Sequence, residues 1–345
     1  MARITSQGPL TIADYMAECL LHPEFGYYTT RDPLGAEGDF TTAPEISQMF
    51  GEMLGLSLAQ CWMDQGAPTQ FVLAEAGPGR GTLMADVLRV VRAVPGFAEA
   101  AEVHLIEASP TLRKKQQEKL GADVTWHDSV ATLPRDLPLF FLANEFFDAL
   151  PIRQFQRDGD GWRERLVGLK ASALTPGLGD RVDVPSLRAR LEDTQDGDIV
   201  EICPSAEPII TEVGQRIDAN GGAALIIDYG DWRSQGDTLQ ALKAHQFVDP
   251  FTAPGSADLT AHVDFEALAQ ATPSGHSRLT PQGVFLERLG ITHRAQGLAQ
   301  TLSGDRLNAH IAAHRRLTHP EEMGNLFKVL ALFPTDGAPP PGCET

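Results

Sequence analysis

The amino-acid sequence predicts an α/β protein built on a doubly wound, mostly parallel sheet, with an N-terminal helical cover and an inserted module. Two observations lead to this fold class. From residue 70 onward, apolar runs of strand length alternate with segments of helical periodicity, which is typical of parallel β-α-β units. The chain also has 345 residues, 42% of them hydrophobic, so it can bury a sizeable core and form roughly two domains.

Residues 1–66 are expected to form a helical and lid region ahead of the sheet. Apolar residues recur at near-helical spacing in LTIADYMAECLL, which starts at Leu10. The Gly-rich section GYYTTRDPLGAEGDFTTAPE follows, and Pro44 then opens a second helix that continues to about Gln65. Proline suits the start of a helix because its missing N–H has no partner to lose there.

Residues 67–151 are expected to form the first part of the core. The run QFVLAEAG predicts a buried parallel strand, and GTLMADVLRVVRAV predicts the helix that follows it. EVHLIEA is expected to be a second strand and SPTLRKKQQEKL a helix capped by Ser109. DVTWHD and PLFFLANE then predict the third and fourth strands of the sheet.

Residues 152–197 interrupt this rhythm and predict an inserted module, with a hairpin around Asp158–Gly161 followed by an irregular polar stretch. The core is expected to resume over residues 198–333. Its segments are the strand DIVEIC, the helix PSAEPIITEVGQRI, the strand AALIIDYG, the helix HVDFEALAQAT and two late strands in HSRLT and NLFKVLAL. The Pro- and Gly-rich residues 334–345 predict a flexible tail.

Composition narrows the class of partner. The formal net charge is −18, which disfavours nucleic acid as a partner because phosphate binding needs a basic face. The four cysteines form no C-x-x-C pair, as expected for a reduced, intracellular protein. Neither a signal core nor an apolar run of bilayer length occurs, so we expect no membrane insertion.

The sharpest motif is the turn Glu75-Ala-Gly77-Pro-Gly79-Arg-Gly81-Thr, placed between a predicted strand and a predicted helix. Three glycines at alternate positions let the backbone approach a ligand without a Cβ in the way. The helix N-terminus adds free N–H groups and the positive end of a dipole. Such a turn suits a carboxylate, a pyrophosphate or a ribose.

The spacing of the glycines discriminates between nucleotide sites. A dinucleotide fingerprint is G-x-G-x-x-G, and a P-loop is G-x-x-x-x-G-K-[ST]; neither matches this turn. The pattern E-x-G-x-G-x-G instead resembles motif I of the Rossmann-like class I methyltransferases, which bind S-adenosylmethionine. In that class the acid at the strand end, here Glu75, helps to orient the methionine moiety.

Two further acids follow neighbouring strands. Glu107 ends the second strand, where a carboxylate can accept hydrogen bonds from both ribose hydroxyls. Asp128 follows the third strand, where such enzymes often contact the adenine amine. The cofactor-binding set is therefore Glu75, Gly77, Gly79, Gly81, Glu107 and Asp128. Taken singly, each of these acids is explained as well by a structural role, as a solvated carboxylate at a strand end or as a helix cap, as by cofactor binding.

The fourth strand ends in Ala143-Asn144-Glu145-Phe146-Phe147-Asp148. In doubly wound sheets the binding crevice lies beyond the carboxyl ends of the strands, so Asn144, Glu145 and Asp148 are the candidate catalytic residues. Two carboxylates can bind a guanidinium group in bidentate pairs or accept its proton. The structural alternative is an acid-rich helix N-terminus.

Several longer segments resemble the MidA-type family of S-adenosylmethionine-dependent protein arginine methyltransferases. These are HPEFGYY, GDFTTAPEISQMFGE, EAGPGRGTLMADVLR, ANEFFDALP, VEICPSA, ALIIDYG, SADLTAHVDF and MGNLFKVL. The resemblance implies S-adenosylmethionine as cofactor, S-adenosylhomocysteine as product, and a protein substrate in respiratory complex I (NADH dehydrogenase), whose assembly the family serves. The family's eukaryotic members are mitochondrial, and a bacterial-looking chain is expected to be cytoplasmic; a homodimer stays open.

The resemblance also assigns residues by position. It places Asp39, Phe40, Thr41, Pro44 and Glu45 in a lid over the cofactor. Asp228 and Tyr229 end a further strand at the rim of the crevice, although an aspartate before Gly230 is as well explained by a turn. His262 lines the substrate side or is a structural residue at a helix start.

The remaining motifs give no competing chemistry. His310 and His314 share a helical face, but HIAAH lacks the Glu of H-E-x-x-H and no third ligand is indicated, so we expect no metal. No G-x-S-x-G elbow occurs, which disfavours a hydrolase. Three functions stay open: a protein arginine methyltransferase, which we favour, a methyltransferase with another acceptor, and a non-catalytic assembly factor that keeps the fold.

Overall fold

The computed structural model describes residues 1–30 and 42–345 and has a mostly parallel central sheet in the order β15-β17-β10-β5-β2-β3-β4, with β14 and β16 at its margins. Strands β2, β3, β4, β5 and β10 run parallel, and β17 is antiparallel to β10. Their bounds are β2 (Phe71–Ala76), β3 (Ala101–Ile106), β4 (Val124–His127), β5 (Leu139–Asn144), β10 (Gly222–Asp231), β14 (Val263–Asp264), β15 (Gly275–His276), β16 (Thr280–Pro281) and β17 (Phe327–Phe333). The class I α/β fold expected from the sequence is therefore confirmed.

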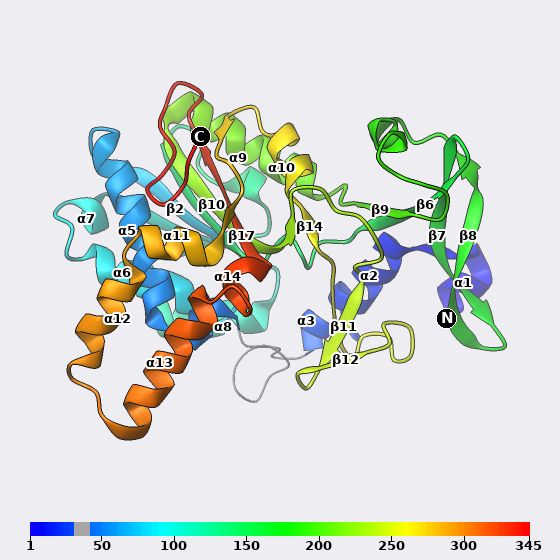
Figure 1. Ribbon diagram of the computed structural model, residues 1–345, viewed down its shortest axis with the longest axis horizontal. Coiled ribbons are helices and arrows are strands. Elements are labelled where there is room, and N and C mark those ends of the chain that lie inside the picture. The colour runs from blue at the N-terminus through cyan, green and yellow to red at the C-terminus, as the bar shows by residue number, and fades with distance from the viewer. Residues whose placement is uncertain (31–41) are drawn as a thin grey trace.

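Helices cover both faces of this sheet (Figure 1). Leu73 and Leu142 face one layer, formed by α5 (Gln48–Asp64), α6 (Thr82–Val91), α11 (Gln282–Arg288), α12 (Ile291–Ala299) and α13 (Gly304–Thr318). Their chain neighbours Val72 and Phe141 face the opposite layer of α9 (Ala206–Asn220) and α10 (Phe265–Ala271). This alternation along strands buried on both sides explains their continuous apolar runs.

A second, antiparallel sheet stands apart at one end of the molecule, beside the N-terminus (Figure 1). It contains β1 (Leu10–Thr11), β6 (Arg153–Asp158), β7 (Gly161–Lys170), β8 (Ala173–Val182) and β9 (Ile199–Ile202). The expected hairpin is present, since Asp158 pairs with Gly161. Two expectations were wrong: residues 173–182 form a long strand, and β9 pairs with β6 instead of joining the core.

β9 belongs to the antiparallel sheet because this sheet has an apolar core of its own. Trp162 and Phe155 are fully buried against Leu187 and Val200. Val200 lies on β9, so moving β9 to the central sheet would expose this cluster to water. The inserted module therefore begins at β6 and is closed by a strand that the sequence pattern assigned to the core.

A third small sheet was not expected at all. It contains β11 (Gln240–Lys243), β12 (Gln246–Val248) and β13 (Asp258–Thr260), in the order β12-β11-β13. Ala241 and Leu259 pack with Tyr15 and Met16 of α2 (Ile12–Leu21), the main helix of the N-terminal cover. The cover is thus anchored by a sheet from the C-terminal half of the chain.

Two local expectations also need correction. The helix that was predicted to run from Pro44 to Gln65 is broken at Ser47, whose backbone is extended and whose hydroxyl accepts a hydrogen bond from Met49 N. It therefore forms α4 (Ala43–Ile46) and α5. Residues 334–345 pack against the body, because Ser57 donates to Pro341 O (2.8 Å) and Arg278 N to Glu344 O (2.8 Å).

The remaining helices connect these sheets. They are α1 (Ala2–Gln7), α3 (Tyr27–Thr30), α7 (Phe97–Ala100), α8 (Pro110–Leu120), α14 (Met323–Leu326) and three 3₁₀ turns at Val130–Thr132, Pro185–Leu187 and Ala189–Leu191. HSRLT, expected to be one strand, contributes only to the short strands β15 and β16 that flank it, both paired with β17. Among the helices of the described residues, none has the length and apolar character needed to span a bilayer.

Candidate functional site

A large cavity opens beyond the carboxyl ends of β2, β3 and β5. Its volume is about 580 Å³, within the range of small-molecule sites in proteins. Apolar side chains form most of its wall: Leu83, Ile106, Leu112, Phe146, Leu150 and Ile209. The polar groups that reach it include Glu75, Glu107, Asp128, Asn144 and Glu145, so most of the cofactor and catalytic residues predicted from the sequence share one cavity.

The glycine turn forms one side of this cavity and has a left-handed backbone at three positions. The φ angles are 63° at Gly77, 53° at Gly79 and 73° at Gly81. A Cβ at Gly77 would lie 3.0 Å from the ring of Phe146, so the turn has no space for a side chain there. Gly81 is the N-cap of α6, which points the first N–H groups of that helix toward the turn.

Glu75 is buried at the base of the turn with one oxygen that has no hydrogen-bond partner among the described residues. Burial raises the pKa of this carboxyl to about 8, with a further increase from Glu107, while the backbone N–H of Met84 opposes the shift. A buried, unpaired carboxylate oxygen that lines a cavity is suited to a cationic ligand group.

Glu107 follows β3 and faces the same cavity. One of its oxygens accepts from Ser109 N (2.7 Å), and the other accepts from Gln116 Nε2 (3.1 Å). Each oxygen keeps a second lone pair for a ligand hydroxyl. Asp128 lies at the cavity edge, and its side chain is exposed. Arg113 donates hydrogen bonds both to this carboxylate and to Glu107 O.

Gln116 is a functional residue that sequence reasoning missed. It is fully buried on α8, and its Nε2 donates to Gly79 O (2.7 Å) and to Glu107, while its Oε1 accepts from Trp126 Nε1 (2.8 Å). One side chain thus ties the glycine turn to the acid on the next strand. The sequence contains one signal for this residue: Gln116 follows Leu112 by four residues in an otherwise charged helix, so the two side chains lie on one face of that helix.

Another part of the cavity wall is built around Glu145, directly after β5. Glu145 has a left-handed backbone, φ 51°, which is costly for a residue with a side chain. Its carboxylate accepts from Ala43 N (3.2 Å) and Asn144 Nδ2 (3.1 Å). Burial and the neighbouring Asp148 raise the pKa of Glu145 to about 8.

Asp148 and Asp228 are buried next to Glu145. Asp148 Oδ1 has no partner among the described residues, and burial raises the pKa of Asp148 to about 6 although the hydroxyl of Tyr229 opposes this. Asp228 is fully buried and accepts from the N–H groups of Phe147 (3.0 Å), Asp148 (3.2 Å) and Tyr229 (3.0 Å). Asp228 therefore holds the loop after β5, and neither Asp228 nor the predicted catalytic residue Asp148 lines the cavity.

The predicted lid is described only in part. Pro44 and Glu45 line the cavity, and Glu45 accepts from Thr82 Oγ1 (2.5 Å), which links α4 to the start of α6. Asp39, Phe40 and Thr41 lie outside the described residues. His262 packs edge-on against Tyr229, with ring centroids 5.4 Å apart.

The histidine alternative receives no support. His310 bonds to Ala295 O and His314 to Thr292, so their rings have different partners. Within residues 1–30 and 42–345, no three His, Cys, Asp or Glu side chains gather as metal ligands would.

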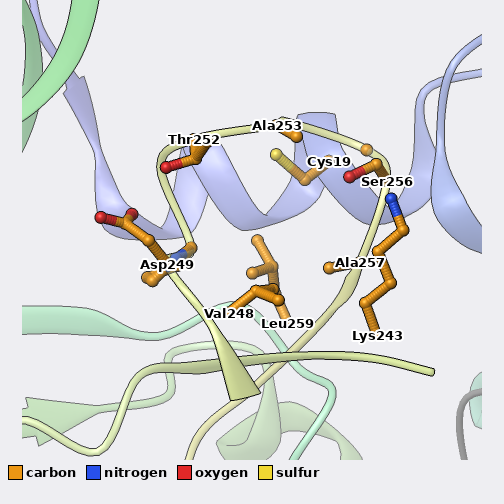
Figure 2. A pocket seen from close by; sticks show the side chains of 11 residues that line it. Cys19, Lys243, Val248, Asp249, Thr252, Ala253, Ser256, Ala257 and Leu259 are labelled. Atoms are coloured by element: carbon orange, nitrogen blue, oxygen red, sulfur yellow. The ribbon is translucent and has the colours of Figure 1, made fainter. Parts of the chain in front are cut away.

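A second cavity of about 140 Å³ lies between α2 and the loop over residues 248–257 (Figure 2). Cys19, Ala257 and Leu259 form its interior, with Lys243 and Asp249 at its sides. Burial raises the pKa of the Cys19 thiol, so this cysteine is not activated as a nucleophile. None of the described residues lines both cavities, although Leu20 and Leu21, which follow Cys19 on α2, line the larger one.

Comparisons with known proteins agree with this geometry. Residues 53–284 match the family described as "Putative S-adenosyl-L-methionine-dependent methyltransferase". The mitochondrial protein arginine methyltransferases NDUFAF7 of Xenopus laevis and Homo sapiens are each 38% identical to the chain, covering 96% and 97% of it and 83% and 82% of their own lengths. A Burkholderia thailandensis protein, in a crystal structure bound to S-adenosyl-homocysteine, superimposes with a TM-score of 0.83 at 30% identity, over 98% of this chain and 92% of that one.

The position of Gln116 yields a stability prediction. In Gln116→Leu, Gly79 O, Glu107 and Trp126 lose a buried partner, and we expect the free energy of unfolding to fall by about 2–3 kcal/mol. Urea unfolding followed by circular dichroism measures this change. The matched control is Gln117→Leu at the exposed neighbour, where we expect a change within about 0.5 kcal/mol. Equal losses in both variants would contradict the role given to Gln116.

Proposed function

The chain belongs to the family of S-adenosylmethionine-dependent methyltransferases, and from this premise we propose that it methylates a guanidinium nitrogen of arginine in a protein substrate. The relatives at 38% identity are named protein arginine methyltransferases, which supports the acceptor class. The observation on which the proposal rests is the group of buried carboxylates beside the cofactor cavity.

The residues of the large cavity fit the cofactor. Glu75 offers an unpaired buried oxygen to the amino group of the cofactor's methionine part. The turn from Gly77 to Gly81 has no side chain at its three glycines, so the cofactor can approach the backbone of the turn. We assign Glu107 to the ribose hydroxyls and Asp128 to the adenine; both residues line the same cavity as Glu75. When bound, S-adenosylmethionine supplies an electrophilic methyl group; the protein supplies the alignment of donor and acceptor.

The proposed acceptor site contains no ion pair among the described residues, although the charge of Arg316 opposes the rise in the pKa of Glu145. Glu145, Asp148 and Asp228 are buried together, and none of them forms an ion pair with a Lys or Arg among the described residues. Burial raises the pKa values of these carboxyls, so they hold protons more readily until a cation enters. Arginine matches this site because its guanidinium is always charged and binds carboxylates through a planar fork.

In the proposed methyl transfer, the carboxylates and the apolar side chains of the site have different roles. Glu145 and Asp148 orient the guanidinium and accept the proton that the nitrogen loses as its new bond to carbon forms. The sulfur of the cofactor keeps the electron pair of the bond that breaks. The apolar wall formed by Phe146, Leu150 and Leu83 excludes water from the reacting groups.

The finer identity of the substrate follows from the family resemblance alone. We propose that the methylated arginine belongs to a subunit of respiratory complex I and that the chain acts in the cytoplasm. The favoured function predicts methylarginine in a protein fraction of a lysate that lacks this enzyme. Label found only in small molecules would assign the site to another acceptor.

A substitution in the glycine turn tests the cofactor placement. In Gly79→Val a β-branched side chain must take a left-handed backbone (φ 53°) in the wall of the cavity. We expect the affinity for S-adenosylhomocysteine to fall at least about a hundredfold in calorimetry, since a distorted turn no longer fits the ligand.

The matched control is Gly177→Val in β8, where the space around a Cβ is open and φ is not positive. It should bind S-adenosylhomocysteine like the unmodified chain. Unchanged affinity in Gly79→Val would remove the turn from the cofactor site.

A second substitution tests the acceptor site. Glu145→Gln keeps a carbonyl oxygen for the N–H of Ala43 but loses the negative charge, so we expect unchanged S-adenosylhomocysteine binding and at least about tenfold slower methyl transfer. Mass spectrometry of arginine methylation in the lysate measures the rate. Transfer at the unmodified rate would exclude Glu145 from the mechanism.

The raised pKa values of these carboxyls also predict the pH dependence. Since Asp148 ionises near pH 6 and Glu145 near pH 8, the carboxylates that receive a cation form as the pH rises from about 6 to 8. Methyl transfer is therefore expected to increase over this interval. In Glu145→Gln the increase near pH 8 should disappear, and its persistence would assign that ionisation to another group.

A further inference from the structure

Two residues that line the large cavity each bury one side-chain oxygen that has no hydrogen-bond partner among the described residues. One oxygen is Oε2 of Glu75 on β2, and the other is Oδ1 of Asn144 at the end of β5. Glu75 is 3% exposed and Asn144 is 8% exposed. Since a buried acceptor without a partner costs free energy, the two oxygens indicate a ligand group that donates hydrogen bonds.

The central sheet brings these two residues close together. β2 and β5 are neighbouring parallel strands, and Glu75 on the first pairs with Leu142 on the second. Asn144 lies two residues beyond Leu142, so it shares a face of the sheet with Glu75. The spacing of neighbouring strands and the rise along a strand place the Cα atoms of Glu75 and Asn144 about 8 Å apart. Side chains of this length can reach one group from both positions.

The amide group of Asn144 has a defined orientation. Its Nδ2 donates to Glu145 Oε1 (3.1 Å), and the same oxygen accepts from Ala43 N (3.2 Å). A rotated amide would bring Oδ1 of Asn144 against this acceptor, and two acceptors do not bond. Oδ1 is therefore the end of the amide that faces away from Glu145 and remains available to a donor.

The order of the strands decides which part of the cofactor reaches these oxygens. β5, β2, β3 and β4 follow one another across the sheet. Glu107 and Asp128, the proposed ribose and adenine residues, follow β3 and β4. The opposite end of the cavity, at β2 and β5, is then left for the methionine part of the cofactor, whose amino group carries a positive charge.

An ammonium group matches the two oxygens because it has three N–H donors and no acceptor. It can donate to Glu75 and Asn144 at the same time, and hydrogen bonds that involve a charged group are stronger than neutral ones. The carboxylate of the same methionine part would meet two acceptors here and gain no bond. The negative charge of Glu75 balances the ammonium, and the neutral amide of Asn144 adds an acceptor without a second buried charge.

We propose that Asn144 binds the cofactor: its Oδ1 and Oε2 of Glu75 form a clamp for the ammonium group of S-adenosylmethionine. Asn144, predicted from the sequence as a catalytic residue, is thereby assigned to the cofactor. The inference deepens the proposed function and rests on it for the placement of the ribose and the adenine. Two successive residues at the end of β5 then have different partners, since Glu145 remains with the acceptor.

The test compares two ligands that differ only in the amino group. They are S-adenosylhomocysteine and its deaminated analogue, in which hydrogen replaces that group, and calorimetry measures both affinities. Asn144→Leu keeps the branched shape of the side chain and removes the oxygen. We expect the affinity for S-adenosylhomocysteine to fall at least about tenfold, because a hydrogen bond to a charged group is lost. The affinity for the deaminated analogue should change by less than about twofold.

Two further variants complete the comparison. Glu75→Gln removes the charge of the clamp and should show the same ligand dependence as Asn144→Leu. The matched control is Asn308→Leu at an exposed asparagine of α13, for which both affinities should stay unchanged.

Two results would overturn the proposal. Unchanged affinities for both ligands in Asn144→Leu would separate Asn144 from the cofactor. An equal loss for both ligands would show that the lost contact does not involve the amino group. If Asn144→Leu does not fold, as judged by circular dichroism, Asn144→Ala removes the same oxygen with a smaller side chain.

The experiment contains no acceptor, so its outcome is independent of the group that is methylated. A chain that methylates no arginine but shows the expected ligand dependence would refute the proposed acceptor and support the clamp. A chain that methylates arginine while Asn144→Leu binds both ligands normally would do the reverse. Failure of the unmodified chain to bind either ligand would refute the cofactor placement and the clamp together.

Discussion

The burial of Asp228 at the carboxyl end of β10 is the constraint on which the site depends. Its oxygens have no contact with water and accept the N–H groups of Phe147 and Asp148 together with that of Tyr229. The loop after β5 must therefore turn back against β10, and Glu145 takes a left-handed backbone at the start of that turn. The strain at Glu145, about 1–3 kcal/mol for such a residue, is held by these bonds and by the core beneath them.

The same loop links the two halves of the reaction. Phe146 lies against Gly77 of the glycine turn, while Glu145 lines the cavity and Asp148 is buried on the same loop. The short helix α4 contacts both the glycine turn's helix and this loop, because Glu45 accepts a hydrogen bond from Thr82 and the N–H of Ala43 donates to Glu145. A displacement of either the turn or the loop would therefore move residues of both proposed binding sites.

Much of this arrangement could be predicted from the sequence because it depends on local patterns. Strands buried on both faces leave continuous apolar runs, and a turn that needs three left-handed residues leaves three glycines, so β2, β3, β5 and the glycine turn after β2 were predicted correctly. Asn144, Glu145 and Asp148 follow from their place at a strand end. What could not be predicted depends on partners distant in the sequence. The strand β9 was predicted but its pairing with β6 was not, the short strands β11 and β13 have no periodicity of their own, and Gln116 and Gln240 are ordinary polar residues until the fold brings Gly79 and Tyr229 to them.

The enclosure of the carboxylates has a consequence for selectivity. Each raised pKa means that the empty site prefers protons to free negative charge, so a ligand must supply positive charge to displace them. A neutral acceptor of similar shape would leave the carboxyls protonated and would gain no ion pair. A lysine brings a single compact charge, whereas a guanidinium spreads its charge over a fork that can engage Glu145 and Asp148 together. Under the proposed function, the burial of these carboxyls thus favours arginine over lysine and over a neutral acceptor.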